Sequence, residues 1–211
     1  MPRSPTAVPY RLPHEVQRAT LKFFQHVLEQ SEVSNSQPHV WITGSRSLNV
    51  PCASEFYPYA MQDFLRVLGD KSRYTPHVFH GGAEGPDSWL GFAARQTHAV
   101  EHVYFPNGKL DVTWDGAPFG LPPRATWKPL KEPESFEDFY ERNRALVDDV
   151  VQYEKDMPCA FSIGLVFLDD ASDSRGTHYT RDYARKLGLS PYVLQLNTAH
   201  WIVGGTEPAG L

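Results

Sequence analysis

Two periods of apolar and polar positions alternate along the chain. Apolar residues that recur every three to four positions indicate amphipathic helices. Short unbroken apolar runs indicate strands that are covered on both faces. The helical pattern covers residues 13–30, 57–68, a segment beginning at 86, 135–153 and 177–187. The strand pattern covers residues 40–43, 77–80, 100–105, 160–168 and 192–196.

This alternation predicts an α/β fold with a parallel sheet and helices on both of its faces. We expect a Rossmann-like three-layer sandwich of about five parallel strands. Residues 1–39 form an N-terminal tail and helical extension, and residues 40–211 form a single domain. Ligands of such sheets bind beyond the carboxyl ends of the strands.

Residues 106–134 interrupt the alternation. The segment is rich in proline and glycine and contains Trp114 and Trp127. A long irregular segment inside a compact domain is usually functional or disordered, and the tryptophans favour an ordered flap. Residues 135–138, which follow it, resemble a capping box with Asp in place of Glu.

Composition limits the classes of protein that this chain can belong to. Its 211 residues suit one domain, and 41% hydrophobic with 21% charged residues are globular values. The formal charge of −5 argues against a general nucleic-acid binder. Cys52 and Cys159 are far apart in the sequence and form no Cys-x-x-Cys pair, so neither a disulfide framework nor a zinc ribbon is indicated. No apolar stretch approaches ~20 residues and no signal peptide is evident, so we expect a soluble cytoplasmic protein with no membrane partner.

A glycine-rich turn follows the second predicted strand. Gly81, Gly82 and Gly85 let the backbone approach a ligand closely, and the helix that follows would direct N–H groups toward an anion. The turn, including Ala83, therefore suggests a phosphate cradle. A tight turn with positive φ is the structural alternative, and the pattern matches neither the P-loop nor the dinucleotide fingerprint. Asp87 either stabilises the helix start or accepts a hydrogen bond from a ribose or base.

Two further polar turns also follow predicted strands, at residues 44–46 and 174–177. Both contain an arginine, whose planar guanidinium suits phosphate. Because the carboxyl ends of parallel strands lie at one edge, we expect the three turns to converge. The candidate residues also have structural alternatives. Arg46 could be a solvated surface residue, and Ser174 could be a helix N-cap. Asn143, within the helix predicted over 135–153, could be a core residue whose amide is hydrogen-bonded to the backbone.

Metal and thiol chemistry are disfavoured. His98 and His102 are four residues apart, but they straddle a predicted loop-to-strand boundary where that spacing does not converge. We expect His80 to be a hydrogen-bonded turn residue. Neither cysteine has an evident base partner. No cofactor is expected.

Four motifs occur in a characteristic order: Ile-Thr-Gly-Ser-Arg at 42–46, His-Gly-Gly-Ala-x-Gly-x-Asp at 80–87, Arg-Asn at 142–143 and Arg-Gly-Thr at 175–177. In them the chain resembles the YspA-like branch of the SLOG superfamily, Rossmannoid domains related to DprA and the LOG phosphoribohydrolases, over residues 40–197. The resemblance implies a site for nucleotides or nucleotide-derived molecules such as ADP-ribose. The implied ligand-binding residues are Gly44, Ser45, Arg46, Gly81, Gly82, Ala83, Gly85, Asp87, Trp127, Arg142, Asn143, Ser174, Arg175, Gly176 and Thr177.

LOG-type hydrolases carry a Gly-Thr-x-x-Glu pattern, and Thr180 stands here at the position of that glutamate. A neutral hydroxyl does not stabilise an oxocarbenium ion as a carboxylate does. We therefore expect a binding protein that acts as a sensor, carrier or sequestering module. The alternative is an N-glycoside hydrolase or transferase that acts on a nucleotide through Asp87 or an acidic residue of the flap. A DprA-like nucleic-acid accessory is disfavoured, and pairing of two copies is an open alternative.

Overall fold

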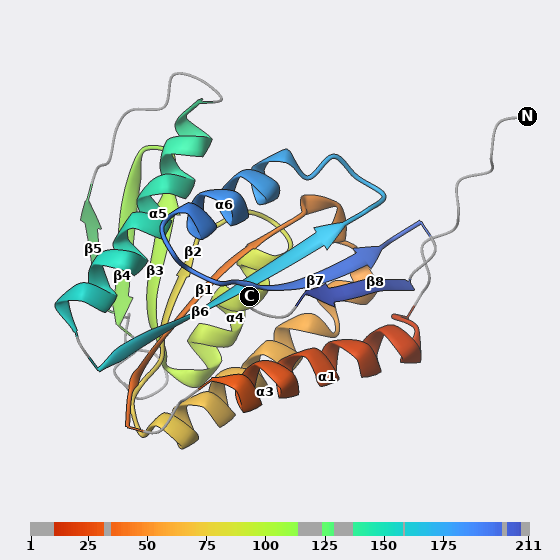
Figure 1. Ribbon diagram of the computed structural model, residues 1–211, viewed down its shortest axis with the longest axis horizontal. Coiled ribbons are helices and arrows are strands. Elements are labelled where there is room, and N and C mark those ends of the chain that lie inside the picture. Colours follow the sequence, from red (N-terminus) through yellow and green to blue (C-terminus); the bar gives the residue numbers. More distant parts are fainter. Residues whose placement is uncertain are drawn as a thin grey trace, which may run out of the picture.

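The computed structural model describes residues 11–31, 35–113, 124–128, 137–157, 159–199 and 202–207, and the structural statements below concern these ranges. Its strands form one eight-stranded sheet in the order β5-β4-β3-β2-β1-β6-β7-β8 (Figure 1). The strands are β1 (Gln37–Gly44), β2 (His77–His80), β3 (Val100–Phe105), β4 (Gly108–Thr113), β5 (Arg124–Lys128), β6 (Ala160–Asp169), β7 (Tyr192–Asn197) and β8 (Ile202–Glu207). The helices are α1 (His14–Gln30), η1 (Arg46–Leu48), α2 (Pro51–Ser54), α3 (Tyr57–Ser72), α4 (Pro86–Thr97), α5 (Glu137–Asp156) and α6 (Arg175–Lys186).

The centre of the sheet is parallel. Strands β3, β2, β1, β6 and β7 pair in parallel, and β1 and β6 run in register from Gln37 and Ala160 to Gly44 and Phe167. This confirms the predicted Rossmann-like fold with five parallel strands. Since parallel strands point the same way, the loops after β1, β2 and β6 all leave the sheet at one edge.

Helices cover both faces of this sheet. Successive residues of β1 alternate between the faces, as the period of two requires. Val40 and Ile42 belong to the core formed with α1, α3 and α4, whereas Trp41 belongs to the core formed with α5 and α6. Helix α1 contributes Phe23 and Phe24 to the first core, so the N-terminal helix packs into the same domain. None of the described helices is long and apolar enough to span a membrane.

Three antiparallel strands extend the parallel centre. Strands β4 and β5 continue the sheet beyond β3, and β8 pairs with β7. Part of the predicted flap is therefore sheet, while residues 114–123 and 129–136 lie outside the described ranges. In β4, Leu110 and Val112 alternate with polar residues, a strand signal that the surrounding prolines obscured. The predicted capping box is only partly described, since α5 begins at Glu137.

Candidate functional site

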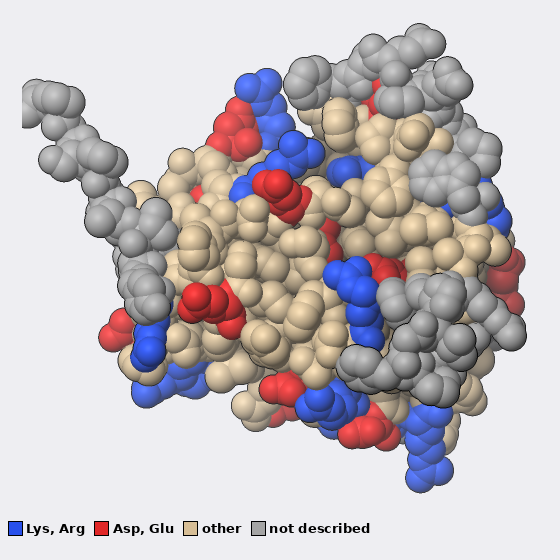
Figure 2. All heavy atoms as spheres, turned by 180° about the vertical axis from the view of Figure 1, so that it is seen from behind, with Lys and Arg blue, Asp and Glu red and all other residues tan. Residues whose placement is uncertain are grey.

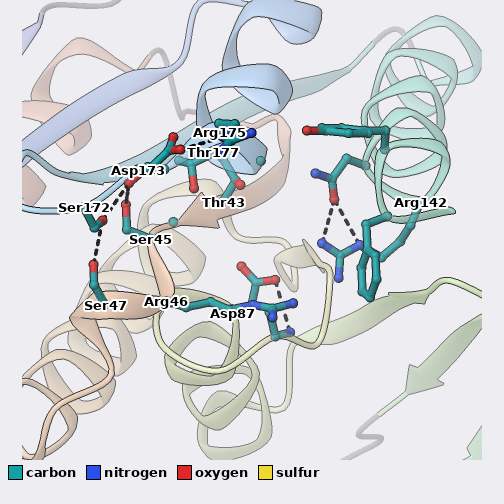
Figure 3. A pocket seen from close by; sticks show the side chains of 17 residues that line it. Thr43, Ser45, Arg46, Ser47, Asp87, Arg142, Ser172, Asp173, Arg175 and Thr177 are labelled. Atoms are coloured by element: carbon teal, nitrogen blue, oxygen red, sulfur yellow. Dashed lines mark hydrogen bonds and ion pairs between the residues drawn. The ribbon is translucent and has the colours of Figure 1, made fainter. Parts of the chain in front are cut away.

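A cavity of about 830 Å³ lies at the carboxyl edge of the sheet, beside the N-terminal turns of α5 and α6. It is lined by residues 43–47 at the end of β1 and just after it, by Ala83 and Asp87 around the start of α4, by four residues of α5 and by residues 172–177 before and within α6. Figure 3 shows Arg175 and Thr177 on one side, Arg142 across from them, and Arg46 and Asp87 below. The three turns predicted from the sequence therefore meet at one cavity.

Most of the predicted site residues line this cavity, but not all of them do. Gly81, Gly82 and Gly85 belong to the adjoining turn and are not part of the lining. The side chain of Trp127 lies outside the described residues. The predicted residues that line the cavity are Gly44, Ser45, Arg46, Ala83, Asp87, Arg142, Asn143, Ser174, Arg175, Gly176 and Thr177.

Three backbone N–H groups of the glycine turn, those of Gly81, Gly82 and Ala83, donate within the protein. Asp87 Oδ2 accepts the N–H of Gly81 at 3.0 Å and that of Ala83 at 3.3 Å. The Gly82 N–H donates to His80 Nδ1 at 3.1 Å. The N–H groups that we expected to face a phosphate are therefore engaged by side chains of the same segment. Glu84, at the tip of the turn, is exposed and accepts a hydrogen bond from Asn49.

The glycines of this turn also have structural reasons of their own. Gly82 and Gly85 adopt φ of 64° and 87°, the left-handed region that favours glycine. A Cβ at Gly81 would lie 2.7 Å from Cζ of Arg142, so the guanidinium packs directly against the backbone. The structural alternative, a tight turn, accounts for Gly82 and Gly85, and the packing of Arg142 accounts for Gly81.

His80 supports the turn from below. Its Nδ1 accepts the Gly82 N–H, so the proton resides on Nε2, which donates to Oε1 of Glu101 at 2.9 Å. Both side chains are almost fully buried. This confirms the expectation of a hydrogen-bonded turn histidine.

The buried Asp87 and the half-buried Arg142 form a polar wall of the cavity. Arg142 Nη1 donates to the Gly81 carbonyl at 2.8 Å, and its Nε and Nη2 both donate to Asn143 Oδ1. Burial raises the pKa of Asp87, and the positive charge of Arg142 opposes that rise. Burial lowers the pKa of Arg142, and the negative charge of Asp87 opposes that decrease. Arg142 thus closes the glycine turn in addition to facing the cavity.

An aromatic ring lies between two guanidinium groups at the mouth of the cavity. Cζ of Arg46 and Cζ of Arg142 are 5.8 Å and 5.6 Å from the ring centroid of Phe139. Both distances are within the range of cation–π attraction. Phe139 and its neighbour Tyr140 were missed in the sequence, although Phe139 stands three and four residues before Arg142 and Asn143, the spacing that aligns side chains on one helix face.

The turn before α6 carries hydroxyl groups and an open helix N-terminus. Ser174, the N-cap residue, makes no side-chain capping hydrogen bond, and a Cβ at Gly176 would meet nothing within 4 Å. Ser45 Oγ and Ser174 Oγ are hydrogen-bonded to each other. Ser174 Oγ also lies 3.1 Å from Ser172 Oγ, which in turn lies 2.9 Å from the hydroxyl oxygen of Ser47. A row of hydroxyls therefore lies beside a helix end that favours anions.

Asp169, at the end of β6, anchors this hydroxyl row. Its carboxylate accepts hydrogen bonds from the Ser47 hydroxyl at 2.6 Å and from the Thr198 hydroxyl at 2.8 Å. Burial opposes its ionisation, but the hydrogen bonds from Ser47 and Thr198 hold its pKa below the usual value. The sequence offered no signal for this role, because Ser47 and Asp169 are brought together only by the pairing of β1 with β6.

Charges on the cavity surface are mixed. Arg175 Nε pairs with Asp173 Oδ2 at 2.5 Å, and both side chains are largely exposed. On the face seen in Figure 2, the described Lys and Arg residues are interspersed with Asp and Glu and form no single basic surface.

The described residues contain no group of three or more His, Cys, Asp or Glu that could hold a metal ion. His98 ends α4 in a left-handed conformation. The ring nitrogens of His102 in β3 are engaged by Asp111 at 2.7 Å and His77 at 3.1 Å.

Comparison of the chain with protein-family models, with curated proteins and with solved structures gave no match. The similarity to the SLOG superfamily therefore stays a prediction from the four motifs, and the site must be judged from its geometry.

Proposed function

We propose that the protein binds a phosphorylated nucleoside derivative in this cavity, as a sensor, carrier or sequestering module. The observation that carries the proposal is the open N-terminus of α6 beside the hydroxyls of Ser45 and Ser174. Backbone N–H groups at such a helix end, together with hydroxyl donors, match the oxygens of a phosphate. The phosphate is assigned here rather than to the glycine turn, because the N–H groups of Gly81, Gly82 and Ala83 already have acceptors within the protein.

The opposite side of the cavity suits the nucleoside. Phe139 offers an aromatic face beside Arg46 and Arg142, and bases stack on aromatic rings and on guanidinium planes. Three arginines face two aspartates in the lining, although the whole chain carries a formal charge of −5. The volume of about 830 Å³ falls within the range of small-molecule and cofactor sites.

Binding is favoured over LOG-like cleavage by the surroundings of Thr180. Its side chain is buried, accepts a hydrogen bond from Asn143 Nδ2 and donates to the Gly176 carbonyl. It offers the cavity no carboxylate at the position where LOG-type hydrolases have glutamate.

Isothermal titration against AMP, ADP-ribose, NAD and cyclic AMP tests the proposal, with adenosine as the control that lacks phosphate. We expect saturable binding to at least one phosphorylated compound and markedly weaker binding of adenosine. The proposal fails if none of the phosphorylated compounds binds saturably.

One observation favours a second candidate, an N-glycoside hydrolase or transferase. Asp87 lines the cavity, and burial raises its pKa, as in carboxyl groups that act as general acids. Against this, its Oδ2 is already engaged by two backbone N–H groups. Chromatography of free base released from AMP or NAD would distinguish the two, since release abolished by Asp87→Asn would support the enzyme.

A further inference from the structure

A continuous chain of hydrogen bonds crosses the floor of the cavity from α6 to the glycine turn. The Thr180 hydroxyl donates to the Gly176 carbonyl at 2.8 Å, and Asn143 Nδ2 donates to Thr180 Oγ1 at 2.7 Å. Asn143 Oδ1 accepts Nε and Nη2 of Arg142 at 3.0 and 2.7 Å, and Arg142 Nη1 donates to the Gly81 carbonyl at 2.8 Å. The chain joins residues that are far apart in the sequence and lie on three elements.

The direction of every bond in this chain is determined by chemistry. A guanidinium can only donate, so the oxygen of the Asn143 amide must face Arg142. The amide nitrogen must then face Thr180, whose oxygen accepts it. Thr180 has one hydroxyl proton, and that proton goes to the Gly176 carbonyl. Arg142 therefore sets the orientation of the Asn143 amide, and Thr180, whose proton is used by the Gly176 carbonyl, supplies the acceptor that this orientation needs on its other side.

Because these side chains are largely buried, their hydrogen-bonding groups have few other partners. Thr180 is 1% exposed and Asn143 is 8% exposed, so water cannot readily replace a lost partner. Burial disfavours the charged form of Arg142 and so lowers its pKa. Without the Asn143 acceptor, the guanidinium would lose two of its hydrogen bonds while it stays buried.

We propose that Thr180 and Asn143 are positioning residues that act through Arg142. They hold its guanidinium against the Gly81 carbonyl and join it to the first turn of α6, so that the two walls of the cavity form one unit. In this arrangement the amide of Asn143 binds Arg142 and Thr180 and does not contact the ligand. The inference takes the cavity as the binding site of the proposed function, but the arrangement of Arg142 can be tested without any ligand.

Hydrogen exchange followed by NMR gives two signatures: the Arg142 Nε–H, which belongs to the hydrogen-bond chain, and the Gly81 N–H, which donates to Asp87 in the turn that Arg142 holds. Thr180→Val removes the hydroxyl at nearly constant volume, and Thr180→Ser restores it. The matched control is Thr20→Val, since Thr20 is equally buried and also donates to the carbonyl four residues earlier, but lies in α1. We expect Thr180→Val to speed exchange at both groups about fivefold, the size of one lost hydrogen bond between neutral groups, because the Asn143 amide loses its partner.

Thr180→Ser should exchange like the wild type, and Thr20→Val should leave both signals unchanged. Unaltered exchange at Arg142 and Gly81 in folded Thr180→Val would overturn the proposal. If that variant does not fold, Thr180→Ala, which keeps a strong helix former, is judged by the same signals. Titration of AMP, ADP-ribose, NAD and cyclic AMP into the same variants separates the two proposals. If the wild type binds none of them, the proposed function is refuted, whereas the exchange result still decides the role of Thr180.

Discussion

Gly44, the last residue of β1, lies in direct contact with Pro86, the first residue of α4. A Cβ at Gly44 would stand 2.2 Å from Pro86 Cγ and 2.7 Å from Pro86 Cβ. Proline has a rigid ring, so the clash cannot be relieved by rotating a flexible side chain. This contact fixes the start of α4, and with it Asp87, against the end of β1. The glycine of the Gly-Ser-Arg turn is therefore explained by helix packing.

We predict that Gly44→Ala destabilises the protein by about 1–3 kcal/mol or more, the usual cost of overpacking. Denaturant unfolding measures the change. Gly176→Ala is the matched control, because a Cβ there meets nothing within 4 Å. It should leave stability unchanged or slightly raised, yet weaken AMP binding, since Gly176 lines the cavity. Equal stability of Gly44→Ala and wild type would contradict the contact.

Arg46 and Arg175 should contribute to binding and little to stability. Arg46 forms no ion pair with another described residue, and the only partner of Arg175 in an ion pair is the exposed Asp173. We expect Arg46→Ala and Arg175→Ala each to weaken binding of the best phosphorylated ligand about tenfold, the effect of losing a charged hydrogen bond. Thermal unfolding temperatures should stay close to that of the wild type.

The control for these variants is Arg66→Ala, because Arg66 is likewise an exposed arginine paired with an aspartate, Asp63, but lies on α3. It should alter neither binding nor stability. Parallel losses of stability in Arg46→Ala and Arg175→Ala, with unchanged affinity, would assign these arginines to the fold.

Asp87 holds the glycine turn closed, so its replacement should loosen that turn. Asp87→Leu leaves the N–H groups of Gly81 and Ala83 without their acceptor, at a cost of about 1–3 kcal/mol for each buried donor. Asp87→Asn keeps a carbonyl oxygen for them and should cost less. Chemical denaturation compares the two, with the exposed Asp63→Leu as control. A Leu variant as stable as the wild type would show that the turn does not depend on this carboxylate.

The parallel centre and the meeting of the three turns could be predicted from the sequence. Buried strands such as β6 read as unbroken apolar runs, and the direction of parallel strands places all following loops at one edge. Both signals are local or topological, so neither needs knowledge of side-chain partners. For the same reason the turns at residues 44–46, 81–85 and 174–177 were assigned to one edge correctly.

The hydrogen-bond partners of the polar side chains at the site could not be predicted in this way. That Asp87 accepts the donors of the glycine turn, or that Asn143 joins Arg142 to Thr180, depends on helix placement that no local pattern encodes. Strands β4 and β5 were missed because they lie in a segment rich in prolines, which hides the alternation of apolar and polar residues. Sequence patterns thus locate polar residues at the site, whereas tertiary structure decides whether they serve the ligand or one another.

Three histidines lie side by side on the α5 face of the sheet, on neighbouring strands. His39 and His77 are paired across β1 and β2, and His77 Nδ1 lies 3.1 Å from His102 Nε2. His102 is bonded in turn to Asp111, so it accepts at Nε2 and His77 donates to it. Neither ring nitrogen of His39 has a hydrogen-bond partner among the described residues. This arrangement therefore favours the neutral form of all three imidazoles.

Burial, and secondarily the charge of His102, lowers the pKa of His39 from 6.5 to about 4 and that of His77 to about 3. Below about pH 6.5 these two histidines are protonated in the unfolded chain but stay neutral in the folded protein. The free energy of unfolding therefore falls as the pH falls from there toward 4. Each histidine can contribute up to about 1.4 kcal/mol per pH unit in this window. Denaturant unfolding from about pH 7.5 to about pH 5 should show this loss. His39→Phe removes one titrating group among aromatic neighbours, so its free energy of unfolding should depend less steeply on pH. A wild-type free energy that stays flat over this range would refute the prediction.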